Sequence, residues 1–522
     1  MNSQYASRID SWFRCALLAG GLLYVLVYIV VALLRIQYPF ELEWLEGALL
    51  DHVRRIVSGK PLYTPPSLEF VPFVYPPLYF YLSAALSKVV GLGFVPLRLV
   101  SFAASLGSFV VIFLLVRKET ESTYLGMLSS CLFAATFRIG GAWFDIGRVD
   151  SLFIFFFLVA VYFLRNGTSA KWFLLSGILF SLSFLTKQTA LVISAPVLLY
   201  CLFSDWRRCF FVVGTVGLII GTMTLLLDHI HHGWYSYYFL NFTGKHFSEK
   251  AGLFSFWSTD VAPVSIAFVL ALFYLLRRSS DASRGRQFFH SALAVGMIGG
   301  PWICRLDTGS FNNVVLPAYA CISILFGLAM NEIMQEIEIA SLNKQYMLKT
   351  YIYLVCMVQF LCLVYNPLAQ IPSSADLEAG NRFVNEVRQM KGDVFIPYHP
   401  YLATMAGKGP YAHYLAAFGV VRGKEGAPRT TLINETRQAI RQKRFAAIIL
   451  DSKHDWFHED VEASYTMEEG SLFIEEALFR PVTGGRTRPE FVYVPRSTDT
   501  GSRISSGCCM VRQEAAIAGI IS

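Results

Sequence analysis

Apolar stretches long enough to cross a bilayer recur along the first 366 residues of the chain. A membrane-spanning helix needs roughly 20 consecutive apolar residues. By this measure the sequence predicts about eleven spans and an α-helical polytopic membrane protein. The predicted spans cover residues 15–35, 95–116, 122–139, 150–165, 172–186, 189–204, 209–228, 259–276, 288–304, 313–331 and 347–366.

A further apolar stretch, residues 75–91, is shorter and begins with two prolines after its first residue. Short cytoplasmic loops are enriched in Lys and Arg. If 75–91 does not cross and the N-terminus is cytoplasmic, every basic loop falls inside. These loops hold Arg117 and Lys118, Arg165 and Lys171, Arg207 and Arg208, and the cluster 277–286. We therefore predict that 75–91 is an interfacial helix on the outer face, with the C-terminus extracytoplasmic.

Composition supports this picture of a multi-pass protein of the inner or plasma membrane. The chain is 54% hydrophobic and 16% charged, whereas about a quarter of the residues in a soluble domain are charged. The net charge of +7 lies mostly in the short basic loops, so it indicates topology rather than a nucleic-acid partner.

The pattern changes near residue 367 from long apolar runs to alternating helix and strand signals. The sequence predicts helices at 376–390 and 435–444 and strands at 392–398, 445–451 and 489–495. We expect three parts, a transmembrane domain (1–366), a small extracytoplasmic α/β domain (367–497) and a disordered tail (498–522). The segment 397–413 follows a strand, where ligands often bind, or is an ordinary loop. Its polar residues, expected to be exposed, are His399, Tyr401, Lys408 and His413.

Three glutamates follow the first span on its predicted outer side, Glu41, Glu43 and Glu46. Residues 41–58 are predicted to form a helix that ends at Gly59. On a helix Glu43 and Glu46 share a face, where repulsion and burial can raise the pKa of one and make it a general base. The pair can also bind a cation, or the acids can simply offset the helix dipole, which suits Glu41 best.

Cations gather at the same predicted face. Arg98 opens the 95–116 span, Lys187 lies where two spans turn, and Arg148 stands with Asp150 at the mouth of 150–165. Charged groups at a membrane edge are functional candidates, and three cations around one cavity suit a phosphate or pyrophosphate. Each alone can also be an interfacial anchor.

Other polar residues of the outer face are candidates for substrate binding. The loop 228–257 is rich in His and aromatic residues, including His246. Its histidine spacing is not a metal-ligand pattern, so no metal ligand is predicted, and a mobile lid over a lipid or sugar is favoured. Asn312 and Asn313 can bind sugar hydroxyls or cap a helix. We add Tyr75, at the edge of 75–91.

In their order along the chain, these motifs resemble the GT-C superfamily of multipass glycosyltransferases that use polyprenyl-phosphate sugars. Relatives include bacterial aminoarabinose transferases and protein O-mannosyltransferases. The motifs are "GKPLY", "YPPLY", an arginine that opens a span, "RVD", "LTKQTAL" and "NNVVLP". The resemblance covers about residues 1–366 and is strongest in the first 200. The motifs are specific for the superfamily and not for a substrate.

The resemblance implies an inverting displacement on the outer face, transferring a sugar to an envelope lipid, glycan or protein. A carboxylate of the first outer loop deprotonates the acceptor, and cations stabilise the leaving lipid phosphate. The family usually has an acidic pair there; Leu45 takes the place of the first acid, Glu46 matches the second, and Glu43 can replace the missing one. Asp150 matches an acid that opens the fourth span. Substrate binding is expected from Arg98, Arg148, Lys187, Tyr75, His246, Asn312 and Asn313.

The resemblance leaves a divalent cation, magnesium or manganese, open as a cofactor, because some relatives use one and others do not. A transporter or flippase of a lipid-linked sugar is the main alternative function. It would show internal repeats and helices broken near the bilayer midplane, and we find no repeat. A polysaccharide ligase or polymerase shares the same donor, and the sequence does not separate it from a transferase. No nucleotide-binding fingerprint is present.

Overall fold

We describe the protein from a computed structural model. It describes residues 3–241, 251–277, 281–306, 311–468, 470, 472–473 and 475–496. The predicted tail 498–522 and the candidate His246 lie outside the described residues.

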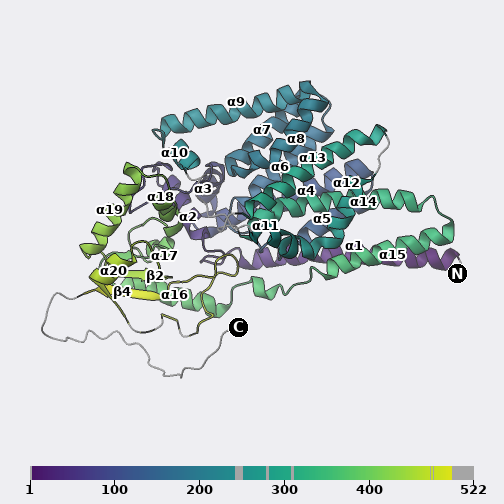
Figure 1. The fold of residues 1–522 in the computed structure, drawn as a ribbon. Coiled ribbons are helices and arrows are strands. Elements are labelled where there is room, and N and C mark those ends of the chain that lie inside the picture. The colour runs from purple at the N-terminus through teal and green to yellow at the C-terminus, as the bar shows by residue number, and fades with distance from the viewer. Residues whose placement is uncertain are drawn as a thin grey trace.

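A bundle of long helices makes up most of the molecule (Figure 1). Every segment predicted to span the membrane falls on a helix. The helices are α1 (Ser3–Arg35), α4 (Phe94–Thr120), α5 (Thr123–Ala135), α6 (Asp150–Asn166), α7 (Ala170–Thr186), α8 (Thr189–Ser204), α9 (Trp206–Ile230), α12 (Ser265–Leu276), α13 (Asp281–Cys304), α14 (Leu316–Ile337) and α15 (Leu342–Leu361). α12 is preceded by α11 (Ala251–Ser255), a π-helical turn η1 (Phe256–Val261) and a 3₁₀ turn η2 (Ala262–Val264).

Length and composition separate these helices into two groups. Among the described residues, five stretches are long and apolar enough to cross a membrane, 7–35, 94–120, 206–230, 251–276 and 312–337. Shorter apolar helices are α5, α7, α8 and α3 (Leu78–Val90). The predicted polytopic helical architecture is confirmed, while the side of the membrane on which each end lies stays a prediction.

Helix α14 lies at the centre of the bundle. Its residues from Leu316 to Met330 are all buried, because it packs against α4, α5, α12 and α13. Small residues allow this close approach: a Cβ on Gly327 would come within 2.1 Å of Ser129 Oγ on α5. Small residues at helix contacts are the usual means by which helices pack without a hydrophobic driving force between them.

Short elements gather at one end of the bundle, next to the C-terminal region, which we define as residues 367–496 (Figure 1). They are α2 (Glu46–Val57), α3, α10 (Trp234–Asn241) and the 3₁₀ turns η3 (Asn312–Val315) and η4 (Leu368–Gln370). The predicted start of a helix at residue 41 is wrong, because α2 begins only at Glu46. The residues before it are held by contacts from elsewhere in the chain, which are described below. Gly59, with φ of +71°, follows the end of α2 as predicted.

The C-terminal region is a small four-stranded sheet with surrounding helices. The strands β1 (Val394–Phe395), β2 (Ala447–Leu450), β3 (Tyr465–Met467) and β4 (Phe491–Pro495) lie in the order β1-β2-β4-β3, with β1 and β2 parallel and the other pairs antiparallel. Its helices are α16 (Ser374–Gln389), α17 (Pro400–Met405), α18 (Tyr414–Arg422), α19 (Ala427–Arg441) and α20 (His458–Ser464). The predicted strands and helices are confirmed, whereas β3, α17, α18 and α20 were not predicted.

Candidate active site

The segment between α1 and α2 forms a buried loop, residues 41–45, rather than the start of a helix. The Glu46 amide donates to the Glu43 carbonyl at 2.9 Å, which makes a turn, and the Leu42 carbonyl accepts from the Thr483 amide at 3.1 Å. Glu41, Glu43 and Glu46 are 5%, 0% and 0% exposed. The interpretation of Glu41 as a solvated helix-start charge is therefore wrong.

Both carboxylate oxygens of Glu46 accept hydrogen bonds from Arg98 and from backbone amides. Arg98 binds both carboxylate oxygens, at 2.7 Å through one terminal nitrogen and 3.1 Å through Nε. The amides of Gly147 and Leu42 donate to the same carboxylate at 2.5 and 2.7 Å. Burial alone would raise the pKa of Glu46, but Arg98 and the two amides outweigh it, so the pKa is lowered. Glu46 is an ionised structural carboxylate.

Arg98 uses its whole guanidinium inside the protein. Besides Glu46, its terminal nitrogens donate to backbone carbonyls at the end of α1 and in the loop that follows, those of Arg35, Ile36, Tyr38 and Phe40. The side chain is 0% exposed. In this arrangement Arg98 fixes the exit of α1 and the position of Glu46, and it offers no free donor to a lipid phosphate.

Glu43 is held by only one of its two oxygens. Its Oε2 accepts from Arg148 at 2.9 Å and from the Leu45 amide at 3.2 Å. The other oxygen, Oε1, is buried without a hydrogen-bond partner among the described residues. Burial raises the pKa of Glu43 to about 7, aided by the charges of Glu46 and Asp150 and opposed by Arg148. A carboxyl in this state can accept a proton near neutral pH.

Asp150 shows the same pattern at the start of α6. Its Oδ1 accepts from Lys187 Nζ at 2.6 Å and from Asn313 Nδ2 at 3.0 Å. Within the described part of the chain its Oδ2 is buried with no partner. Asn312, the neighbour of Asn313, is turned away, since its amide donates to the Ile139 carbonyl at 3.2 Å.

Arg148 binds Glu43 directly and lies close enough to Asp150 for their charges to interact. It also donates to the Tyr75 hydroxyl at 3.1 Å and lies over the Trp143 ring at 5.0 Å. Its Nε is buried and has no partner in the described residues. Of the residues predicted for the site, the structure therefore brings together Glu43, Tyr75, Arg148, Asp150, Lys187 and Asn313, with Glu46 and Arg98 in a neighbouring pair and Asn312 outside.

The C-terminal region covers Glu43, which the sequence did not indicate. Thr483 pairs with Glu43 in an isolated β-bridge, and its hydroxyl accepts from Trp143 Nε1 at 3.2 Å. Gly484 has φ of +70°, and a Cβ there would lie 2.9 Å from Glu43 Oε1. Only glycine fits this conformation and approach without strain. Residues 483 and 484 thus form a strap over the free oxygen of Glu43.

Two further buried ion pairs were missed. Arg35, in the last turn of α1, binds Asp145 through Nε at 2.8 Å and a terminal nitrogen at 2.6 Å. A charge at the end of an apolar span is a general signal for such a pair. The second is His399 with Glu41 and Asp451, which are described below.

The polar residues of segment 397–413 are not exposed as predicted. His399, Tyr401 and His413 are 3%, 1% and 4% exposed, so that expectation is wrong for them. The Tyr401 ring packs against α2 at Gly47, and the His413 ring packs against Trp44 and Phe73. Lys408 is half-buried, and its ammonium donates to the Met390 carbonyl.

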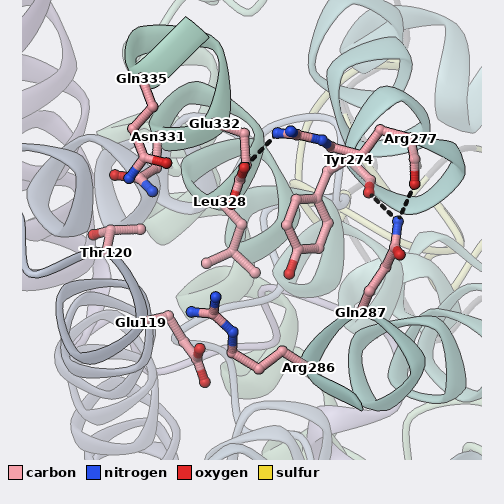
Figure 2. Close-up of a pocket in the computed structure, with 10 residues that line it drawn as sticks. All are labelled: Glu119, Thr120, Tyr274, Arg277, Arg286, Gln287, Leu328, Asn331, Glu332 and Gln335. Atoms are coloured by element: carbon pink, nitrogen blue, oxygen red, sulfur yellow. Dashed lines mark hydrogen bonds and ion pairs between the residues drawn. The ribbon is translucent and has the colours of Figure 1, made fainter. Parts of the chain in front are cut away.

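A separate polar pocket, with a volume of about 250 Å³, lies at the far ends of α4, α12, α13 and α14. Figure 2 shows the residues that line it. Thr120 in its lining stands 22 positions along α4 from Arg98, roughly 33 Å at 1.5 Å per residue. Arg277 pairs with Glu332, and the Gln287 amide donates to the carbonyls of Tyr274 and Arg277 at 2.9 and 2.8 Å (Figure 2). Since this pocket shares no lining residue with the candidate site and lies at the other end of α4, it is not part of that site.

The fold is that of a helical membrane protein with a small α/β region near its C-terminal end. The dolichyl-phosphate-mannose-protein mannosyltransferase family matches residues 74–232. The fold is similar to that of ArnT from Cupriavidus metallidurans bound to undecaprenyl phosphate, with 12% identity, a TM-score of 0.58, and coverage of 92% of this chain and 99% of that one.

It is also similar to the archaeal oligosaccharyltransferase AglB from Archaeoglobus fulgidus, solved with an inhibitory peptide and a dolichol-phosphate. The identity is 10%, the TM-score 0.54, and the coverage 94% of this chain and 75% of that one. A comparison with curated protein sequences gives no match. The resemblance to GT-C glycosyltransferases is confirmed by a family model over part of the chain and by the fold.

Proposed function

We propose that the protein transfers a sugar from a polyprenyl-phosphate donor to an envelope lipid, glycan or protein on the outer face of the membrane. The solved relatives carry such lipids, undecaprenyl phosphate in ArnT and dolichol-phosphate in AglB. The observation that carries the proposal is the free Oε1 of Glu43, a buried carboxylate oxygen without a partner among the described residues, beside Arg148.

Glu43, rather than Glu46, is the base in this proposal. A general base works best when its pKa lies near the working pH, and burial raises the pKa of Glu43 to about 7. Glu46 has no oxygen free of strong donors, because Arg98 and two backbone amides occupy it. Protonation of Glu46 would also break the Arg98 pair, which is buried and costly to leave uncompensated.

The proposed reaction is a single displacement at the anomeric carbon. The acceptor oxygen or nitrogen forms the new bond while the bond from this carbon to the donor phosphate oxygen breaks, with inversion. The acceptor proton goes to Glu43 Oε1, and the bonding electron pair leaves with the lipid phosphate. Arg148 and Lys187 face the increasing negative charge, and Asp150 orients Lys187 through their 2.6 Å contact.

We write the proposed reaction without a divalent cation. Magnesium is usually held by one or two carboxylates together with waters and substrate phosphates, and the two carboxylates of this site, Glu43 and Asp150, are each already paired with a cationic side chain. In the part of the chain that the structure describes, no group of three His, Cys, Asp or Glu side chains is arranged to hold a metal ion. No step of the proposed reaction therefore uses a metal.

The test compares envelope glycans and glycolipids in a deletion strain complemented with variants of the chain. Glu43→Gln is expected to give normal protein levels, loss of the transferred sugar and accumulation of the polyprenyl-phosphate donor. Glu69→Gln is the matched control, because Glu69 is an exposed glutamate of the same end of the molecule. Full restoration of the glycan by Glu43→Gln would refute Glu43 as the base. A deletion strain whose glycans and glycolipids do not differ from those of the wild type would refute the transferase.

A further inference from the structure

Three titratable side chains outside the site form a buried chain between the two parts of the molecule. His399 Nδ1 lies 2.6 Å from Glu41 Oε2, and His399 Nε2 lies 2.8 Å from Asp451 Oδ2. All three side chains are at most 3% exposed. His399 comes four residues after β1 and Asp451 directly after β2. Because β1 and β2 are parallel neighbours, the residues that follow them reach the same edge of the sheet.

The two carboxylates define the state of the imidazole. Toward an ionised carboxylate a ring nitrogen can act only as a donor, and the two contacts hold the ring in one orientation. Burial alone would lower the pKa of His399, but Asp451 and Glu41 outweigh burial and raise it to about 10. Burial also raises the pKa of Glu41 to about 8, against the effect of His399, so at neutral pH the imidazole and Glu41 share a proton across their contact.

Because Glu41 also binds the backbone at Gly47, its contact with His399 restrains the loop that carries Glu43. Glu41 Oε1 accepts from the Gly47 amide at 3.0 Å, so the side chain closes the loop onto the first turn of α2. The packing at this point is tight, because a Cβ on Gly47 would lie 2.4 Å from Glu41 Oε1 and 2.1 Å from the Tyr401 ring. Glu43 lies between these two anchored positions. A shift of the loop would therefore displace the carboxylate of Glu43 from its contacts with Arg148 and the Leu45 amide.

We propose that His399 is a positioning residue of the transfer reaction, which holds the 41–47 loop through Glu41 and thereby places Glu43. The C-terminal region is then part of the catalytic unit. The inference rests on the proposed function for the role of Glu43, whereas the effect of His399 on the loop stands independently of it. A base displaced by about 1 Å can lose about 100-fold in rate.

The experiment uses the full-length chain in nanodiscs, with His399→Gln and Asp451→Asn as the test variants. His454→Gln is the matched control, because His454 is an exposed histidine of the same region. Three quantities are measured: amide hydrogen exchange over residues 41–47, binding of undecaprenyl phosphate, and the glycan restored in the deletion strain. Asp451→Asn keeps a hydrogen-bond acceptor for His399 and serves if His399→Gln does not fold.

Both test variants are expected to speed exchange in 41–47, to leave undecaprenyl phosphate binding within about twofold and to lower glycan transfer about 10- to 100-fold; His454→Gln changes none of these. Faster exchange with unchanged transfer would overturn the positioning role, as would lost transfer with unchanged exchange. If Glu43→Gln still transfers sugar, the proposed base fails, but the exchange result still decides whether His399 holds the loop.

Discussion

The two glutamates nearest the site should respond oppositely to the same substitution. Glutamine keeps the shape of glutamate and removes its charge. Glu43 sits where its charged form is disfavoured, and its pKa is raised to about 7, whereas the pKa of Glu46 is lowered by Arg98 and backbone amides acting against burial. When Glu43 loses its charge, Arg148 still has the charge of Asp150 acting on it, so the penalty for an uncompensated buried cation falls mainly on Glu46→Gln. We therefore expect Glu43→Gln to stabilise the protein and Glu46→Gln to destabilise it.

The pKa of Glu43 gives the size and the pH window of the first effect. A carboxyl whose pKa rises on folding contributes stability at low pH that is lost as the pH rises through the folded value. Between the ordinary 4.5 and about 7, the loss at pH 8 is about 3 kcal/mol at 1.36 kcal/mol per pKa unit. Glu43→Gln should therefore match the wild type near pH 5 and exceed it increasingly up to pH 8.

The second effect follows from the buried ion pair. Glu46→Gln leaves the guanidinium of Arg98, which is 0% exposed, without its counter-charge. Removing one partner of such a pair typically costs about 3–5 kcal/mol, a large part of the stability of an ordinary domain. We expect the variant to be depleted from the membrane or to unfold well below the wild type.

The assay is thermal unfolding of the purified proteins in one detergent, followed by tryptophan fluorescence at a fixed scan rate and at pH 5, 6, 7 and 8. The reasoning is refuted if Glu43→Gln unfolds below the wild type at pH 8, or if Glu46→Gln unfolds with the wild type at every pH. Glu69→Gln, at an exposed position, controls for removal of a charge as such.

Three other outcomes can be checked on the same preparations. Gly484→Ala should lower stability by about 1–3 kcal/mol and reduce transfer, because position 484 has a φ of +70° and the added Cβ would lie too close to Glu43. Gly485→Ala is the control and should change neither quantity, because its added Cβ would lie 3.4 Å from the nearest neighbouring atom. Because folding raises the pKa of His399 to about 10, its charged form stabilises the folded state fully below about pH 6.5, and this stabilisation is lost as the pH rises through 10. The unfolding temperatures of His399→Gln and the wild type should therefore converge between these pH values. Transfer should survive EDTA, and loss restored by magnesium or manganese would contradict the metal-free reaction.

The helical part of the fold could be predicted because hydropathy is a local signal. A run of apolar residues must pair its backbone groups within itself in lipid, so it becomes a helix whatever its neighbours. Polar residues at the ends of apolar runs were predicted as site residues for the same reason, namely Arg148, Asp150, Lys187 and Asn313. In the structure Asp150 binds Lys187 and Asn313, and its charge acts on the nearby Arg148.

The loop that carries Glu43 could not be predicted, because distant residues determine its shape. Thr483 pairs with the backbone at 42–43, and His399 binds Glu41. These contacts span more than 350 positions of sequence, and helix propensity over 41–58 carries no trace of them. A favourable local pattern was thus overridden by tertiary contacts, and only the part beyond Glu46 kept the predicted helix.

The turn at residues 43–46 explains why Leu45 can stand where the resembled family usually has the first acid of its pair. On the predicted helix, Glu43 and Glu46 would share a face and compete for one role. In the turn, Glu46 lies against Arg98 and Glu43 against Arg148, so each carboxylate has its own cation. Leu45 instead packs its side chain into the apolar contact between α2 and the C-terminal region, 5% exposed, while its amide donates to Glu43. An acid at position 45 would be buried among apolar side chains without a cation of its own, so the carboxylate that this loop offers to the site comes from Glu43.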